Sequence, residues 1–326
     1  MKMKKILGVL LTVAALGTML AGCGNDSAKT ETKKVYNVGI VQLTQHPALD
    51  AATEGFKQAL IDKLGEENVK FDEQNASGEA TVCTTIVNSF ISKKVDLIMA
   101  NATPALQAAY NATSTIPILG TSVTEYGVAL GIDNFTGVVG TNVSGTSDLA
   151  PLDEQAAMFT ELLPDAKTVG LLYCSAEPNS EYQVKVVEEA LKAKGLTCTR
   201  FSFSDTNDVS TVTADAAAKC DALYIPTDNT AASCASTIGN IVRDRKVPVI
   251  AGEAGICEGC GIATLSISYK DLGYKTGEMA AKILAGEAKV SEMPVEYATA
   301  SKKYNPVICK ELGIDMTAHS DYTALD

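Results

Sequence analysis

Short apolar runs, many of them β-branched, alternate with longer amphipathic stretches along most of this chain. Strands that alternate with helices produce such a pattern, because a parallel strand pair needs a crossover connection that is usually helical. In the first half we predict strands at residues 35–41, 69–72, 96–100 and 116–120, and helices at 47–64, 81–93 and 104–112. The pattern therefore predicts an α/β fold with a mostly parallel sheet.

A segment rich in Gly, Val and Thr, residues 137–145, interrupts the alternation, which then starts again. In this second series we predict strands at residues 168–173, 197–203, 222–225, 247–251 and 263–267, and helices at 152–163, 180–194, 209–218, 231–245 and 272–285. Two such series predict two doubly wound parallel-sheet lobes joined by a hinge of several crossings. We expect the hinge crossings near residues 137–143, near 267–272 and after 285. The expected division is 35–140 plus 270–290 for the N-terminal lobe and 141–269 plus 291–326 for the C-terminal lobe.

The N-terminus has the order of a bacterial export signal. Lys2, Lys4 and Lys5 precede an apolar run of 15 residues (6–20), which ends in Leu20-Ala21-Gly22-Cys23. The run is short for a membrane span, which needs about 20 apolar residues. A cleavage site that ends on Cys resembles a lipoprotein signal, so we predict a signal peptide at 1–22, lipidation of Cys23 and a flexible spacer at 23–34. An ordinary signal peptide with an incidental Cys is the alternative.

Length and charge fit an exported protein of two lobes. Removing residues 1–22 leaves 304 residues, which is more than one compact core usually holds. The net charge of −12 becomes −15 when the three signal lysines are removed. An acidic surface argues against nucleic acid and against direct binding to anionic lipid. The predicted location is the outer face of the cytoplasmic membrane, held by lipid alone.

Eight cysteines remain beside Cys23, which is a high number for an exported chain. Most are single residues within apolar segments, where free buried thiols are common. Only Cys257 and Cys260 form a close pair, and a disulfide between them is the one bridge that the spacing suggests. A zinc site would need two further ligands from a chain with two histidines, so we expect no metal and no cofactor.

The loops that follow the predicted strands are rich in hydroxyl, amide and helix-start groups. In an open parallel sheet ligands bind beyond the carboxyl ends of the strands, which is where these loops gather. The segments are residues 42–50, 101–105, 144–148, 174–180 and 226–230. Helix-start N–H groups suit an anion such as a carboxylate, at about 0.3–1 kcal/mol per exposed helix end. Each segment is also consistent with ordinary helix capping, although five on one rim favour a binding site.

Catalytic motifs are scarce. The chain has no Gly-x-Ser-x-Gly elbow and no phosphate-binding Gly-x-x-x-x-Gly-Lys loop. His46 could act as a base, but a lone histidine before Pro47 is more typical of a cap or loop residue. The enzyme alternative is an amino-acid racemase with Cys83 and Cys174 as its acid and base. A sensory partner that presents its closed form to a receptor is a third possibility.

Several strings resemble one known family. They are residues 38–42, 46–52, 55–56, 96–98, 102–105, 145–151, 162–167, 179–180, 224–229, 272–273 and 279–281. The chain resembles the lipoprotein substrate-binding components of ABC importers that are related to the tryptophan/tyrosine-binding proteins of Gram-positive bacteria. The resemblance covers about residues 35–314 and implies a type 1 periplasmic-binding-protein fold. It also implies a monomer that closes on a small ligand and is presented to a permease driven by a separate ATPase.

The resemblance implies an aromatic amino acid as the ligand, with branched amino acids, nucleosides and sugars as alternatives. It assigns the ligand carboxylate to Thr103, Ala105, Thr146, Ser147, Asn179 and Ser180. It assigns the ligand ammonium to Asp228, and Gln42 and Pro47 would border the cleft. Thr227 and Asn229 flank Asp228 in the same loop, and Tyr269, Tyr126 and Phe135 are candidates for stacking on an aromatic ligand.

Three places depart from the family pattern. Residues 123–127 read Val-Thr-Glu-Tyr-Gly where Asp-Pro is more usual, Cys174 stands where Asn is common, and residues 253–260 are unusual for the family. These departures concern side-chain specificity and leave the predicted fold unchanged.

Overall fold

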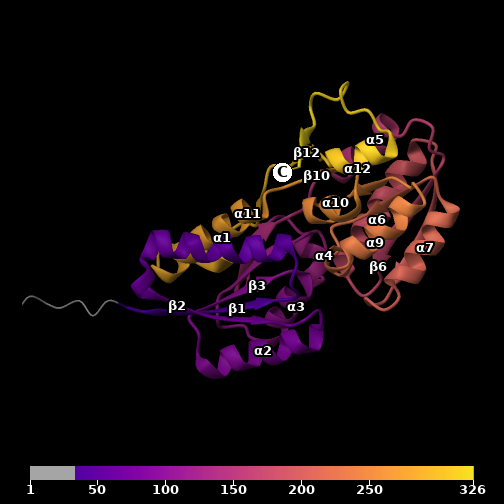
Figure 1. The fold of residues 1–326 in the computed structure, drawn as a ribbon. Helices are drawn as coiled ribbons and strands as arrows, with labels where there is room; N and C mark the ends of the chain where they lie inside the picture. Colours follow the sequence, from indigo (N-terminus) through magenta and orange to yellow (C-terminus); the bar gives the residue numbers. More distant parts are fainter. Residues whose placement is uncertain (1–33, 326) are drawn as a thin grey trace, which may run out of the picture. The chain divides into compact units, whose positions relative to one another are not determined.

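Two mostly parallel sheets organise residues 34–325, the part of the chain that the computed structural model describes (Figure 1). The predicted signal peptide, the lipidation site Cys23 and the spacer up to Lys33 lie outside the described residues. In the first sheet the neighbouring strands are, in order, β11 (Glu296–Tyr297), β5 (Val143–Ser147), β4 (Ile118–Val123), β3 (Leu97–Asn101), β1 (Tyr36–Gln42) and β2 (Val69–Asn75). All pairs in this sheet are parallel.

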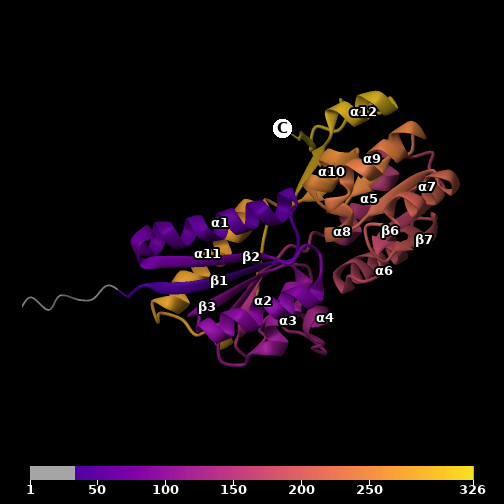
Figure 2. The ribbon, with the colours of Figure 1, turned by 60° about the horizontal axis from the view of Figure 1, so that its bottom comes forward.

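The first sheet is covered on both faces. Its helices are α1 (Pro47–Leu64), α2 (Ala80–Lys93), α3 (Thr103–Ala112), α4 (Tyr126–Leu130) and α11 (Tyr269–Leu284). Helices α1 and α11 lie side by side on one face and α2 and α3 on the other (Figure 2). Alternation along β1 feeds both cores, because Val38 and Ile40 pack with Phe56 of α1 while Val41 packs with Phe90 of α2.

Helix α11 packs against α1 of the first lobe with close backbone contact at glycines of both helices. A Cβ on Gly273 would collide with the carbonyl of Ala52, and one on Gly55 would collide with the carbonyl of Lys270. Close backbone approach of this kind requires glycine. The chain leaves the second sheet after β10, and the contact between α1 and α11 holds the next segment on the first lobe.

The second sheet carries the other series. Its strand order is β13 (Thr323–Ala324), β12 (Ser301–Tyr304), β10 (Ala263–Ser266), β9 (Val249–Ala251), β8 (Ala222–Ile225), β6 (Thr168–Cys174) and β7 (Thr197–Phe203). Only β12 runs antiparallel to its neighbour β10. Its helices are α5 (Leu152–Leu162), α6 (Pro178–Ala193), α7 (Val209–Lys219), α8 (Asn229–Ser233), α9 (Ala235–Asp244), α10 (Ala254–Cys260) and α12 (Pro306–Leu312). The predicted α/β class with two parallel-sheet lobes is confirmed.

Sheet membership corrects the expected division of the chain. Strand β5, expected to open the second lobe, is the fifth strand of the first sheet, and β11 pairs beside it. The small, polar composition of β5 concealed it in the sequence. Gly145 is paired with Gly120 of β4, and a Cβ on Gly145 would collide with the Gly120 carbonyl, so the position requires glycine. The lobes are therefore connected at residues 148–151, at 267–268 and at 298–300.

Two smaller differences concern the second lobe and the membrane. The helix expected at 231–245 is two helices, α8 and α9, which meet at Cys234, and α10 was not expected. Among residues 34–325 no helix is long and apolar enough to cross a membrane.

Candidate functional site

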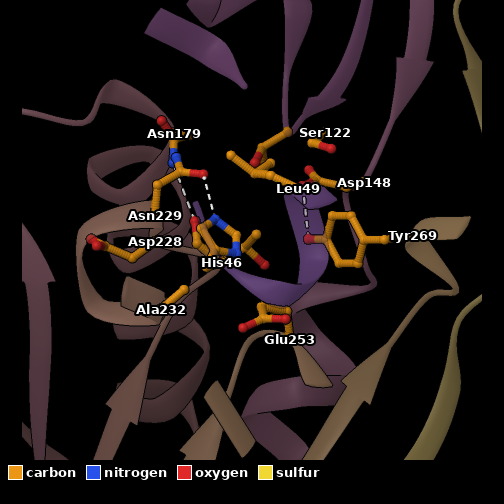
Figure 3. A pocket seen from close by; sticks show the side chains of 12 residues that line it. His46, Leu49, Ser122, Asp148, Asn179, Asp228, Asn229, Ala232, Glu253 and Tyr269 are labelled. Atoms are coloured by element: carbon orange, nitrogen blue, oxygen red, sulfur yellow. Dashed lines mark hydrogen bonds between the residues drawn. The ribbon is translucent and has the colours of Figure 1, made fainter. Parts of the chain in front are cut away.

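A cavity lies where the carboxyl ends of strands from both sheets converge (Figure 3). The cavity volume open to a water-sized sphere is about 10 Å³, which is about the room that one water molecule needs. The lining residues are His46, Leu49, Ser122, Thr124, Asp148, Asn179, Thr227, Asp228, Asn229, Ala232, Glu253 and Tyr269. Parallel strands point their carboxyl ends to one edge of each sheet, so both lobes present their loops to this space.

The first lobe supplies its residues from the ends of three strands. His46 and Leu49 follow β1, where Pro47 begins α1. Ser122 stands at the irregular end of β4 with a φ of 54°, a left-handed conformation that is rare outside glycine. Asp148 comes directly after β5, in the first connection between the lobes. Backbone strain at Ser122, beside a cavity, is the kind of local cost that binding sites carry.

The second lobe supplies carboxylates that already serve as helix caps. Asp228 accepts the Ala231 N–H at 2.7 Å on Oδ1 and the Cys174 N–H at 2.6 Å on Oδ2. Glu253 accepts the N–H groups of Gly255 and Ile256 at 2.7 and 2.5 Å. Capping satisfies helix-start donors that have no partner within the helix.

A buried carboxylate network holds the side chains next to Asp228. Both Glu177 oxygens are used: Oε2 accepts the Asn229 N–H and Nδ2–H at 3.0 and 2.6 Å, and Oε1 accepts from the N–H and hydroxyl of Thr230. Asn229 then turns its Oδ1 to His46 Nε2, 3.3 Å away on the other lobe. This contact links the two lobes at the edge of the cavity.

Burial shifts the pKa values of the cavity acids upwards. It raises the pKa of Asp148 to about 6 and that of Glu253 to about 7. Burial, together with the Glu177 carboxylate, also raises the pKa of Asp228. Burial lowers the pKa of His46, against the opposing effects of Asn229, Glu177 and Asp50. None of the lining residues described above is Lys or Arg, so the cavity holds three acids without a compensating side-chain cation.

Four buried polar atoms of the cavity lining have no hydrogen-bond partner. They are His46 Nδ1, Ser122 Oγ, Asp148 Oδ1 and Asn179 Oδ1. The other Asp148 oxygen accepts the Tyr269 hydroxyl at 3.0 Å, as drawn in Figure 3. A buried polar group without a partner costs about 1–3 kcal/mol, so four around one space indicate a site that a polar ligand completes.

Five of the residues predicted from the sequence line this cavity: Asn179, Thr227, Asp228, Asn229 and Tyr269. The structure brings them together from α6, the loop after β8 and the start of α11. Asp228 lies at the cavity, and its two oxygens are occupied by backbone donors, as the capping alternative supposed. Tyr269 contributes its hydroxyl to Asp148.

The other seven predicted residues lie outside the lining. Ala105 and Thr103 are buried in the first turn of α3, Ala105 within the apolar core, and Ser180 is fully buried beside Asn179. Thr146 bonds the hydroxyls of Thr121 and Thr276, and Ser147 donates to the carbonyl of Thr124. Gln42 is held by Thr53 and Asp50, and Pro47 borders a surface hollow beside Gln45. The side chains of Gln42, Thr146, Ser147 and Ser180 each have an internal hydrogen-bond partner, so they hold strand ends and helix starts behind the cavity rather than facing it.

Seven residues of the lining were not predicted as ligand-binding residues: His46, Leu49, Ser122, Thr124, Asp148, Ala232 and Glu253. Three of them, His46, Leu49 and Asp148, lie in the loop segments 42–50 and 144–148 that were predicted to border a binding site. Asp148 thus had a signal, because it ends the segment 144–148, whereas Glu253 was noted only as part of the unusual segment 253–260. Ser122 had none, since its orientation depends on the irregular pairing of β4 with β5.

The chain matches the family of ABC transporter substrate binding proteins over residues 37–320. It belongs to this family. A tyrosine-binding protein of Clostridioides difficile is 38% identical over 304 residues, which cover 90% of this chain and 88% of that protein. The family resemblance predicted from the sequence is confirmed, and the protein is a substrate-binding protein of an ABC transporter rather than an enzyme.

Solved structures agree with this assignment. A Streptococcus pneumoniae ABC domain in complex with L-Trp is 30% identical, with a TM-score of 0.84 over 88% of this chain and 97% of that chain. A ligand-free, open substrate-binding protein with adhesive properties from Clostridium difficile is 40% identical, with a TM-score of 0.68 over 90% of this chain and 99% of that chain. Proteins of this family act at the cell surface or in the periplasm.

The cysteines of this substrate-binding protein form neither the suggested bridge nor a catalytic pair. Cys257 and Cys260 are both free thiols in α10, where the Cys260 thiol donates to the carbonyl of Ile256 at 3.2 Å. The expected disulfide is thus corrected, because both side chains pack into the apolar core of the second lobe. Cys83 lies in the core of the first lobe and Cys174 in that of the second, so the racemase alternative has no shared site.

Proposed function

We propose that this substrate-binding protein captures an amino acid with an aromatic side chain for an ABC importer. The observation that carries the proposal is the set of four unpartnered buried atoms around an acidic cavity. An amino acid brings an ammonium and a carboxylate, and Asp148 Oδ1 and Ser122 Oγ are unpartnered atoms that suit them. The aromatic side chain is proposed from the tyrosine-binding relative and from the relative in complex with L-Trp.

The charged groups of the ligand fit one side of the cavity. In Figure 3 Asp148 and Ser122 lie close together, with Tyr269 beside Asp148. Asp148 Oδ1 is an acceptor for an ammonium, and the Ser122 hydroxyl is a donor for a carboxylate. Asp148 takes the role that the sequence assigned to Asp228, because both Asp228 oxygens already accept backbone N–H groups.

Closure of the two lobes is part of the proposal. A ligand that touches both rims stabilises the closed state, since only that state offers all its contacts. This chain superposes better on the L-Trp complex than on the ligand-free, open relative, although the open relative has the higher identity. That order supports a closed arrangement of the lobes around the cavity.

The proposal extends to the cell surface. Cleavage before Cys23 and lipidation of that residue would hold the protein on the outer face of the membrane, beside a permease with its ATPase. Metabolic labelling with a radioactive fatty acid tests the anchor: the full chain should take up label and the Cys23→Ala variant should not. Equal labelling of the two would exclude Cys23 as the anchor.

Calorimetric titration tests the ligand. The protein is unfolded and refolded to remove bound solute, then titrated with Trp, Tyr, Phe and Leu. We expect micromolar or tighter binding of an aromatic amino acid and weaker binding of Leu. Binding of a sugar or nucleoside, with none of any amino acid, would overturn the proposal. The variant Asp148→Asn tests whether Asp148 binds the ligand ammonium. Its matched control is Asp153→Asn, which alters an exposed acid in the first turn of α5.

A further inference from the structure

The orientation of one side-chain amide determines where the proton lies on His46. Asn229 Nδ2 donates to Glu177 Oε2 at 2.6 Å, so the amide oxygen of Asn229 is the atom that faces His46 Nε2. An oxygen can only accept, and His46 Nε2 must therefore carry the hydrogen. In the neutral imidazole the other nitrogen, Nδ1, is then a pure acceptor. That atom is buried, lines the cavity and has no partner.

The amide orientation of Asn179 is fixed in the same way, by the hydrogen bonds of its nitrogen, and its oxygen is an acceptor that faces the cavity. Its Nδ2 donates to the carbonyl of Thr227 at 3.1 Å and to Glu177 Oε2 at 3.2 Å, two atoms that cannot donate in return. The amide oxygen of Asn179 is consequently the free end, and it too is buried without a partner. His46 and Asn179 come from different lobes, yet both leave an acceptor unsatisfied.

The cavity thus has two chemically distinct ends. In Figure 3 Asp148, Ser122 and Tyr269 lie on one side, and His46, Asn179 and Asn229 lie on the other, with Leu49 between them. The first end has an acid with a free oxygen and a hydroxyl. The second end has neutral acceptors and no unpartnered donor among the lining residues that the structure describes. An ammonium prefers the free carboxylate, which leaves the acceptors at the second end for another donor on the ligand.

We propose that His46 Nδ1 is a specificity-determining acceptor that receives an N–H or O–H group on the ligand's aromatic side chain. This inference rests on the proposed function and adds to it the requirement for a second donor. A phenol O–H and an indole N–H both meet the requirement, whereas a plain phenyl ring leaves His46 Nδ1 buried and unpartnered. Sites built to bond a ligand donor reject the analogue that lacks it, because the buried acceptor is then unsatisfied.

Two ligand pairs that differ in a single donor test the proposal on the unaltered protein. Tyr and Phe differ by the phenol hydroxyl, and Trp and 3-benzothienylalanine differ by exchange of the ring N–H for sulfur. We expect the donor-bearing member of at least one pair to bind roughly 5–150-fold tighter, as the loss of one buried hydrogen bond predicts. The pair with the larger ratio identifies whether the donor is a phenol or an indole.

Two substitutions of His46 locate the acceptor. His46→Asn keeps an oxygen near the position of Nδ1 and loses the contact with Asn229. His46→Gln keeps a polar group near the position of Nε2 and loses the acceptor at Nδ1. We expect the preference for the donor-bearing ligand to survive in His46→Asn and to fall to about one in His46→Gln.

The outcomes separate this inference from the proposed function. Equal affinity within both ligand pairs would overturn the inference while the amino-acid function stands. The inference would also be overturned if His46→Asn and His46→Gln each weakened the binding of the donor-bearing and donor-lacking ligands equally. His46 would then affect binding only through its contact with Asn229 between the lobes. Failure of all four amino acids to bind the unaltered protein would overturn the proposed function itself.

Discussion

On the first-lobe side of the cavity His46 Nδ1, Ser122 Oγ and Asp148 Oδ1 have no partner, whereas on the second-lobe side Asp228 and Glu253 cap helices α8 and α10. The first-lobe side of the cavity therefore has polar atoms free to bond a ligand, whereas most polar atoms on the second-lobe side already have hydrogen-bond partners within the protein. Asn179 Oδ1 is the one unpartnered buried atom that the second rim contributes to the described lining. Buried acids with free oxygens favour function, and buried acids in caps favour the fold, although a sequence pattern does not distinguish them.

The largest expected effect concerns ligand affinity at Asp148. Asp148→Asn should weaken amino-acid binding by about 100-fold, because the ammonium loses its charged partner in a buried site. Calorimetry on the substituted protein measures the loss. Asp153→Asn, exposed on α5, should bind normally. Equal affinity in Asp148→Asn and the unaltered protein would show that Asp148 does not bind the ligand, and that the acids on the two sides of the cavity do not differ in function.

The second effect concerns stability at Asp228. Asp228→Ala should lower the free energy of unfolding by roughly 2 kcal/mol, since the Ala231 and Cys174 N–H groups lose their acceptor. Urea denaturation at pH 6, below the raised pKa of Asp228, avoids the offsetting gain from removing a buried charge. Asp228→Asn retains an acceptor and should lose less. A variant as stable as the parent would show that the cap is dispensable.

The third effect is the pH dependence of affinity. Burial raises the pKa of Asp148 to about 6, so the carboxylate is ionised at pH 8 and about one-tenth ionised at pH 5. Only the ionised form binds an ammonium strongly, and affinity should fall about ten-fold as the pH decreases from 8 to 5. Protonation of Glu253, whose pKa is raised by burial to about 7, removes a second negative charge from the cavity in the same pH range and adds to the fall. Titrations across this range should give a much flatter profile for Asp148→Asn; a rise in affinity towards pH 5 would contradict the assignment.

The smallest effect is a gain in stability. The folded-state pKa of Asp148 lies above its ordinary value of 3.8, so the ligand-free fold loses stability as the pH rises from about 4 to 6 and stays less stable above that. Asp148→Asn should therefore raise the free energy of unfolding at pH 8 by about 1 kcal/mol and leave it nearly unchanged at pH 3. Urea denaturation at both pH values measures this difference. A destabilised variant at pH 8 would mean that Asp148 supports the fold rather than the ligand.

Much of the fold could be predicted because strand composition and helix-start residues are properties of short sequence segments. Strands β1 and β6 have the apolar composition of buried strands, and α1 begins at a proline in a favoured position. Strand β5 was missed because four of its five residues are Ser, Gly or Thr, and β11 because a strand of two residues shows no alternation. Their place in the first sheet depends on pairing between segments apart in the sequence: Gly145 of β5 pairs with Gly120 of β4, and Glu296 of β11 pairs with Thr146 of β5.

The sequence by itself determined the α/β class and the rim on which the site lies, because periodicity and strand-end loops are local properties, and its resemblance to known strings gave the family. It also placed Asn179, Asp228 and Tyr269 at the cavity. Only the tertiary structure decided which buried groups already have partners. A hydrogen bond such as Asn229 to His46 joins residues 183 positions apart, and one such bond leaves His46 Nδ1 free to meet a ligand.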